Sequence, residues 1–378
     1  MTTPATQSAT NNATASTAMN ELAFYTLPGA PKSPRDLLAE VRDAERIGFG
    51  ACFISERLNI KEAATISGAV GAVSERLGIA TAATNHNTRH PLITAAHAST
   101  MHFLTGGRFA LGLGRGIDGM FSAMGLAPIK TAQLEDFVGL MRRLWRGETI
   151  VNHNGPCGSW PVLRLDPAFN ENIPMVFTAF GPNSLALGGR AFDAVVLHTF
   201  FTDETTARCV QLVKQAAEQA GRDPAAVRVW SCFATIGDHL PYPVRLKKTV
   251  GRMATYLQAY GDLMVRTNNW DPQLLRKFRE APIVASFKGA IDQIANTEQL
   301  EKIATLIPES WLVPAASGSP ARCVKAINGQ FDLGCTGIIL HGAAPAELEP
   351  VVTAYAAQRD VSKFVHLPAN PGTAPSAR

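Results

Sequence analysis

The sequence predicts a closed barrel of eight parallel strands with helices between them, the (β/α)8 or TIM-barrel fold. Short apolar runs alternate with amphipathic helix patterns along most of the 378 residues. Each apolar run ends in polar or glycine residues, as barrel strands do where they reach the rim. The alternative is an open doubly wound sheet, but that fold typically needs only about five or six strands. We expect the eight strands at residues 22–27, 52–54, 77–83, 109–113, 175–179, 194–198, 227–236 and 337–341.

Serine followed by proline marks two of the expected helix starts, in the N-cap and first helical positions. Ser33-Pro34 opens the first helix, which Gly48 and Gly50 close, and Ser319-Pro320 opens a late one. The clearest apolar stripe at helical spacing lies in residues 131–145. We expect helices at 34–47, 62–73, 91–104, 131–145, 183–190, 203–219, from 320 onward, and 347–359.

Two segments are too long for ordinary connections. Residues 148–167 are rich in Gly, Pro and Asn and are expected to be irregular, whereas residues 243–308 form a polar helical insertion. We expect both at the carboxyl-terminal rim, where such loops commonly form lids. The domain organisation is therefore a disordered tail at 1–18, one barrel domain at 19–366 and a flexible tail at 367–378. Met19 is a second candidate for the initiator residue.

Composition restricts the classes of function. The chain is 46% hydrophobic and 17% charged, with a net charge of +4 and no long basic run, which argues against a nucleic-acid partner. No stretch reaches the roughly 18 to 20 apolar residues of a membrane span, and the first 18 residues lack the apolar core of a signal peptide. The six cysteines form no CxxC or CxxH pair, so we expect no metal site and a reducing, cytoplasmic location.

Residues with chemistry follow strands two and three. Glu56 comes directly after an apolar run, where it can transfer a proton or contact a ring-shaped cofactor. The alternative is an ion pair with Arg57 or another basic group of the rim. Thr84 and Asn85 offer a hydroxyl and an amide to the polar edge of a heterocycle. His86 can act as an acid or base, or simply as a hydrogen-bonding residue.

Strands four, five and six end in a second group of such residues. Gly114-Arg115-Gly116 lets the backbone approach a flat ligand and places a cation beside it. The alternative is that these residues form only a tight turn after the strand. Residues 179–184 start a helix at once, so their amides and the side chains of Asn183 and Ser184 can bind a phosphate or merely cap the helix. His198-Thr199 would reach the same rim.

The segment IATAATNHNTRHPLITAAHASTMHFLTGGRFALGLGRG (79–116) resembles the signature of the luciferase-like monooxygenase superfamily. More closely it resembles the actinobacterial branch that uses the deazaflavin coenzyme F420. Supporting stretches are DAERIGFGACFISER (43–57), VGLMRRLWRGETI (138–150) and IPMVFTAFGPNSLALGGRAFDAVVLHTFFT (173–202).

The resemblance implies a cofactor ring lying across the strand ends, above a non-proline cis peptide at Thr81-Ala82 or Ala82-Ala83. It also implies that residues 179–184 hold the tail phosphate and that the barrel forms a homodimer. Glu56 or His86 would relay protons. The residues expected to contact the cofactor are Ser55, Ala82, Ala83, Thr84, Asn85, Gly114, Arg115, Gly116, Ala179, Phe180, Gly181, Pro182, Asn183, Ser184, His198 and Thr199.

Two departures from the family pattern narrow the expected chemistry. Ile117 stands where sugar-phosphate-oxidising members carry an acid, and Glu56-Arg57 replaces a frequent aspartate-histidine pair. We expect an F420-dependent oxidoreductase that transfers a hydride between the deazaflavin and an unidentified small organic substrate. The alternatives are an FMN-dependent monooxygenase served by a separate reductase, and a non-catalytic flavin-binding barrel.

Overall fold

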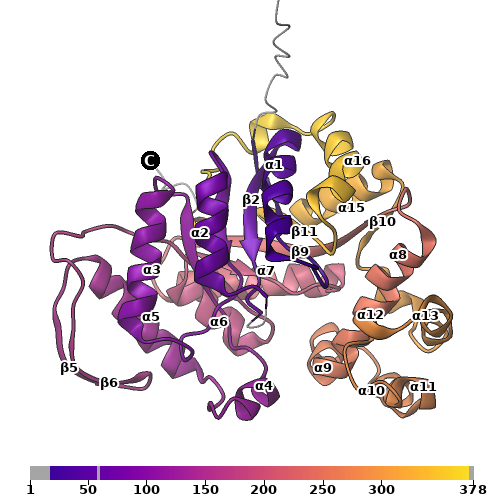
Figure 1. Ribbon diagram of the computed structural model, residues 1–378, viewed down its shortest axis with the longest axis horizontal. Helices are drawn as coiled ribbons and strands as arrows, with labels where there is room; N and C mark the ends of the chain where they lie inside the picture. The colour runs from indigo at the N-terminus through magenta and orange to yellow at the C-terminus, as the bar shows by residue number, and fades with distance from the viewer. Residues whose placement is uncertain (1–17, 58–59, 374–378) are drawn as a thin grey trace, which may run out of the picture.

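Eight parallel strands close into a barrel, so the predicted fold class is confirmed (Figure 1). The structure is a computed structural model and describes residues 18–57 and 60–373. The pairings β1–β11 and β8–β9 complete the ring. Around the ring the strands are β1 (Met19–Tyr25), β2 (Phe49–Ile54), β3 (Gly78–Thr81), β4 (Phe109–Leu113), β7 (Met175–Thr178), β8 (Ala194–Val196), β9 (Arg228–Gly237) and β11 (Gly337–His341).

Helices cover the outside of the ring at the predicted places (Figure 1). The Ser33 side chain caps the short 3-10 turn η1 (Pro34–Asp36), Gly48 ends the first helix in the left-handed conformation, and Ser319 caps the late helix. The outer helices are α1 (Leu37–Ile47), α2 (Ala63–Val73), α3 (Pro91–Leu104), α5 (Thr131–Trp145), α6 (Pro182–Ala191), α7 (Asp203–Gln219), α15 (Pro320–Asp332) and α16 (Pro345–Ala356), with 3-10 turns η2 (Pro224–Ala226) and η4 (Val361–Lys363).

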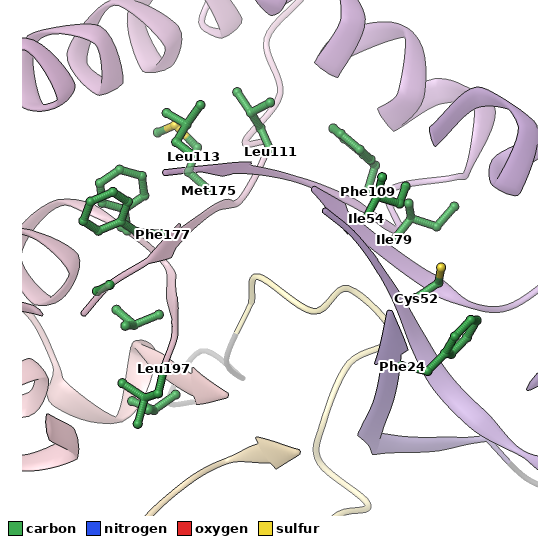
Figure 2. Packing of buried hydrophobic residues seen from close by; sticks show 14 of the residues in the cluster. Phe24, Cys52, Ile54, Ile79, Phe109, Leu111, Leu113, Met175, Phe177 and Leu197 are labelled. Carbon is green, nitrogen blue, oxygen red and sulfur yellow. The ribbon is translucent and has the colours of Figure 1, made fainter. Parts of the chain in front are cut away.

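The strands divide their side chains between two apolar layers, because successive residues of a strand point to opposite faces. One set, which includes Phe24, Ile79 and Phe109, lies between the sheet and the helices (Figure 2). The other set fills the inside of the barrel and is mostly alanine and valine, with Phe53 and Trp230 packed edge-on at 5.1 Å between ring centroids. The barrel is therefore a packed core whose function must lie at its rim.

The amino ends of the strands are covered by residues 367–373, which corrects the prediction that the chain is flexible from residue 367. The side-chain amide of Asn370 donates to the carbonyls of Gly107 and Phe109 at 2.7 and 2.8 Å. Trp230 donates its indole N–H to the Pro371 carbonyl at 2.8 Å. Residues 374–378, and the predicted tail up to residue 17, lie outside the described residues.

The prediction that residues 148–167 are irregular is wrong, because they contain an antiparallel hairpin of β5 (Ile150–Gly155) and β6 (Gly158–Leu163). The hairpin lies between α5 and β7 in the chain and runs along the outer side of α5 (Figure 1). The His153 ring stacks on Trp160 and bonds to the Asp136 carboxylate of α5 at 3.1 Å. Gly155, Pro156 and Gly158, which suggested a loop, lie at the turn of the hairpin, but Pro161 lies within β6.

Residues 243–308 are helical as predicted and follow β9 at the carboxyl-terminal rim. They form a second apolar core with Phe200 of the barrel, to which Met253, Leu257 and Met264 contribute. The sequence did not reveal the short strand β10 (Ala316–Gly318) beside β9, or α4 (Asp118–Ala123) after β4. The insertion consists of α8 (Tyr242–Leu246), the π-helical turn η3 (Lys247–Gly251), α9 (Arg252–Asn268), α10 (Pro272–Glu280), α11 (Pro282–Ala285), α12 (Ile291–Ile294), α13 (Thr297–Ala304) and α14 (Glu309–Leu312).

Two further observations concern the cysteines and the helices. All six cysteines carry free thiols. Within residues 18–57 and 60–373, the helices are either too short or too polar to cross a membrane.

Candidate active site

Glu56 is buried in an ion-pair network at the ends of β2 and β3. Its side chain is 4% exposed and pairs with the Arg89 guanidinium. The Thr84 hydroxyl donates to Glu56 Oε2 at 2.6 Å, and the Ala63 amide donates to Oε1 at 3.1 Å. The rim partner of Glu56 is therefore Arg89, whereas Arg57 donates to the Gly29 carbonyl instead. This network fixes the carboxylate and the Thr84 side chain relative to each other.

Substituting Glu56→Gln should lower the free energy of unfolding by about 2 kcal/mol, because it removes one charge of a buried pair. Arg89 also contacts Glu62, so it would retain one anionic partner. Urea denaturation measures the change, and Glu135→Gln is the matched control because Glu135 is 47% exposed in its pair with Arg190. We expect less than about 1 kcal/mol for the control. Equal stability of Glu56→Gln and the wild type would contradict the assignment of this network.

His86 lies apart from this network. Its ring is buried against Phe137 of α5, with centroids 5.6 Å apart, and its Nδ1 has no hydrogen-bond partner in the described residues. Burial lowers the pKa of His86 to about 4, so the ring is neutral near pH 7. The structure thus brings Glu56 and Thr84 together but does not join His86 to them by any hydrogen bond between described residues.

The tips of β3, β4 and β7 approach one another closely. The peptide bond between Ala82 and Ala83 is cis, at one of the two places expected. The Asn85 amide donates to the Gly114 carbonyl at 2.8 Å. A β-carbon on Gly114 would lie 2.6 Å from Thr178 Oγ1 and 2.9 Å from the Ala83 β-carbon. Glycine at 114 is therefore required for this packing, and the three tips form one continuous surface.

Arg115 joins the end of β4 to the starts of two helices. Its Nε donates to Ser184 Oγ at 2.9 Å, and its guanidinium also reaches the Ile129 carbonyl and the Thr131 hydroxyl. Helix α6 begins after Gly181, and no side chain caps it. The simple capping role considered for Asn183 and Ser184 is therefore not observed, and a cation lies beside an uncapped helix start, an arrangement that suits an anion.

His198 is held between the barrel and the insertion. Its Nδ1 lies 2.9 Å from the Thr199 carbonyl and its Nε2 lies 3.0 Å from the Tyr260 hydroxyl. A carbonyl oxygen only accepts, so Nδ1 carries the proton and Nε2 accepts from Tyr260. Burial lowers the pKa of His198 to about 4 and raises that of Tyr260 well above its ordinary value. One hydrogen bond therefore joins two neutral groups.

Three residues of the insertion were missed as members of the rim: Arg252, Tyr256 and Tyr260. The methionines of this helix and Leu257 are fully buried. The two tyrosines instead contact His198, with ring centroids 5.0 and 5.2 Å away. Their spacing of four residues is the signal that could have found them, although the helix is kinked at Tyr260.

The remaining site candidates are placed as follows. Ser55 Oγ accepts from Lys61 Nζ at 3.0 Å, and the Phe180 ring lies 4.5 Å from His198 between centroids. Away from the rim, ligand atoms of Asp136, His153 and Cys157 lie within 4.8 Å of one another. Asp136 accepts from His153 and from the Cys157 amide, so hydrogen bonds account for that group.

Comparison with known proteins agrees with this architecture. Residues 3–336 match the family model described as luciferase-like monooxygenase. The chain is 24% identical over 303 residues to 5,10-methylenetetrahydromethanopterin reductase of Methanolobus tindarius, covering 78% of this chain and 86% of the relative.

Solved structures share the fold at lower identity. The coenzyme F420-dependent tetrahydromethanopterin reductase of Methanopyrus kandleri has a TM-score of 0.73 at 18% identity, covering 91% of this chain and 99% of that one. A monooxygenase of Streptomyces bottropensis has a TM-score of 0.61 at 19% identity, covering 89% and 98%. Since the family model spans most of the sequence, the chain belongs to the luciferase-like monooxygenase family.

Proposed function

We propose that this protein is an oxidoreductase that uses coenzyme F420 and transfers a hydride between the deazaflavin and a small organic substrate. The observation that carries the proposal is the continuous rim surface at the ends of β3, β4 and β7, with an uncapped helix start and Arg115 beside it. The coenzyme F420-dependent tetrahydromethanopterin reductase of Methanopyrus kandleri shares the fold over most of both chains, which favours this choice of cofactor.

The rim residues suit a flat heterocycle with a phosphorylated tail. Ala82, Ala83, Thr84, Asn85 and the 114–116 turn would contact the ring, since these residues lie together at the ends of β3 and β4. Residues 179–184 and Arg115 would hold the phosphate, because the start of α6 has no internal cap. When bound, the deazaflavin supplies the hydride acceptor or donor.

The rim side chains differ in the role that we assign them in proton transfer. Glu56 holds Arg89 and Thr84 in place, so we assign it a positioning role. His86 packs against Phe137 of α5, and burial lowers its pKa to about 4. The pair of His198 and Tyr260 is better suited to pass a proton to or from a substrate oxygen.

A substrate screen tests the proposed reaction. Ketones would be added to the protein with reduced F420, and alcohols to the protein with oxidised F420, while the absorbance of the coenzyme is followed. Turnover of a member of either set is the expected result. Turnover only with reduced FMN and oxygen would contradict it.

A second candidate is a monooxygenase that uses reduced FMN, and the shared fold of the Streptomyces bottropensis monooxygenase favours considering it. Oxygen uptake separates the two, because a deazaflavin reacts poorly with oxygen while a flavin monooxygenase consumes it. We expect no enzyme-dependent oxygen uptake with reduced F420.

We also propose that the protein forms a homodimer through α2 and α3. These neighbouring outer helices, of 11 and 14 residues, contain no Asp, Glu, Lys or Arg. Ile93, Phe103 and Leu104 of α3 are 61%, 67% and 51% exposed. Two adjacent surface helices without a charge are typical of a covered interface, and a second copy would supply the same apolar face.

Phe103→Glu should therefore weaken the dimer at least about tenfold, because each interface would bury two new carboxylates by symmetry. Light scattering after size exclusion, over a range of protein concentrations, measures the change. Val365→Glu is the control, since Val365 is 78% exposed and distant in sequence from both helices. A monomeric wild type, or a Phe103→Glu dimer of unchanged affinity, would refute the interface.

A further inference from the structure

Three cationic side chains meet at one quarter of the rim, at the ends of β11, β1 and β2. Arg57 Nη1 donates to the Gly29 carbonyl at 2.5 Å, and a β-carbon on Gly29 would lie 4.0 Å from Arg252 Nη2. The backbones of Arg57 and Lys61 form an isolated antiparallel β-bridge, and the Lys61 ammonium lies 3.0 Å from the Leu27 carbonyl. Two parts of the chain therefore bring these cations together, because Arg57 and Lys61 follow β2 and Arg252 begins the insertion helix α9.

The acids nearby do not balance these charges. Arg252 pairs with Asp292 at 3.3 Å, and both side chains are buried. Arg57, in contrast, forms no ion pair within the described residues. Lys61 donates only to neutral oxygens, and its acidic neighbour Glu40 accepts from Thr26 Oγ1 and the Leu27 amide. An unpaired cation in a half-buried place costs free energy that a bound anion would recover.

The electrostatics of neighbouring groups agree with an excess of positive charge. Burial, and next the neighbouring Arg57, lower the pKa of Lys61 to about 7. Burial and then Arg252 lower the pKa of Arg57. His341, at the end of β11, has a pKa well below its ordinary value because of burial and then of Arg252, His198, Lys61 and Arg57. Arg57, Lys61 and Arg252 thus all lie close enough to the His341 ring to disfavour its protonation.

This quarter lies across the barrel from the proposed phosphate site. In the closed order β1–β2–β3–β4–β7–β8–β9–β11, the cations belong to the β11–β1–β2 side, whereas residues 179–184 follow β7. His198, after β8, lies between the two groups and contacts Tyr256 of the insertion. An anion bound by the cations would therefore be separate from the tail of the cofactor.

We propose that Arg57 and Arg252 bind an oxyanion carried by the substrate, beside the buried charge of Lys61, so that the enzyme acts on organic acids or on phosphate esters. Two guanidinium groups suit a carboxylate or phosphate, which each accepts two hydrogen bonds. The proposal rests on the proposed function, because it places the substrate beside the cofactor of the same rim.

Calorimetric titration of the F420-loaded protein with benzoate, and separately with inorganic phosphate, tests it. We expect one of the two anions to bind, and the identity of the tighter one distinguishes a carboxylate from a phosphate ester. Arg57→Gln should weaken that binding at least about tenfold. Arg46→Gln, at an outer salt bridge that is 53% exposed on the arginine side, should leave it unchanged. Thermal unfolding establishes that each variant is folded.

Three results would overturn the proposal: neither anion binds, Arg57→Gln binds as tightly as the wild type, or the anion competes with F420. The last would mean that the cations belong to the cofactor site. Calorimetry of the protein without coenzyme distinguishes this failure from that of the proposed function. Anion binding that depends on Arg57 in a protein unable to bind F420 would contradict the proposed cofactor alone.

Discussion

Substituting Gly112→Ala should unfold or severely destabilise the barrel, with a loss of about 4 kcal/mol or more in the free energy of unfolding. A β-carbon on Gly112 would lie 1.5 Å from the Thr81 carbonyl oxygen and 2.6 Å from its carbon. Both contacts are with backbone of the adjacent strand, so no side-chain rotation can relieve them. The midpoint of urea denaturation, or the soluble yield where the variant does not fold, measures the effect.

The clash at Gly112 would also affect the hydrogen bonds between β3 and β4. Thr81 Oγ1 donates to the Gly112 carbonyl at 2.8 Å and accepts from the Gly112 amide at 2.7 Å, replacing the regular ladder between β3 and β4. Moving the strands apart would break both bonds directly below the rim. Gly139→Ala in α5 is the control, because a β-carbon there meets nothing within 4 Å. It should stabilise the helix by up to about 1 kcal/mol. A Gly112→Ala protein as stable as the wild type would contradict the strand register.

Substituting Tyr260→Phe should lower kcat at least about a hundredfold while leaving F420 affinity within about twofold, since removing a general acid or base commonly costs this much. The phenol hydroxyl is the group that donates to His198 Nε2 at 3.0 Å. Phenylalanine keeps the ring contacts with Phe180 and Tyr256 but ends the proton path. The measurement is kcat and the F420 dissociation constant with the first ketone or alcohol that the screen identifies.

Tyr242→Phe is the matched control for this substitution. Tyr242 lies on α8 of the same insertion and is 50% exposed, so its turnover should equal that of the wild type. If Tyr260→Phe retains full kcat, the proton path through His198 is wrong. If it loses F420 binding instead, the tyrosine contacts the cofactor rather than handling a proton.

The strands and outer helices could be predicted from the sequence because their signals are local. The run Phe109–Leu113 ends in Gly114, and the predicted bounds of β4 are those observed. Helix α5 was likewise placed from Thr131 to Trp145, because its apolar stripe has a single period. The hairpin after α5 was not predicted for the same reason. Its two strands of six residues each are half exposed, so neither contains a continuous apolar run.

The partners of the rim residues could not be predicted, because they depend on contacts between distant segments. An ion pair of Glu56 with Arg57 or another basic group of the rim was only the alternative interpretation, and the loop before α3 brings Arg89 to it. Tyr260 reaches His198 across 62 positions of the chain. Such contacts follow from how the insertion packs on Phe200 and its neighbours, and no local pattern encodes that packing.

The central claim is that the rim of this barrel is built for a deazaflavin, and a direct titration tests it. Purified protein would be titrated with F420 and, separately, with FMN, and the fluorescence and absorbance of each ring followed. We predict saturable binding of F420 with one site per chain, and FMN binding at least about tenfold weaker. No change in the F420 signal up to millimolar protein, or tighter binding of FMN, would contradict the account.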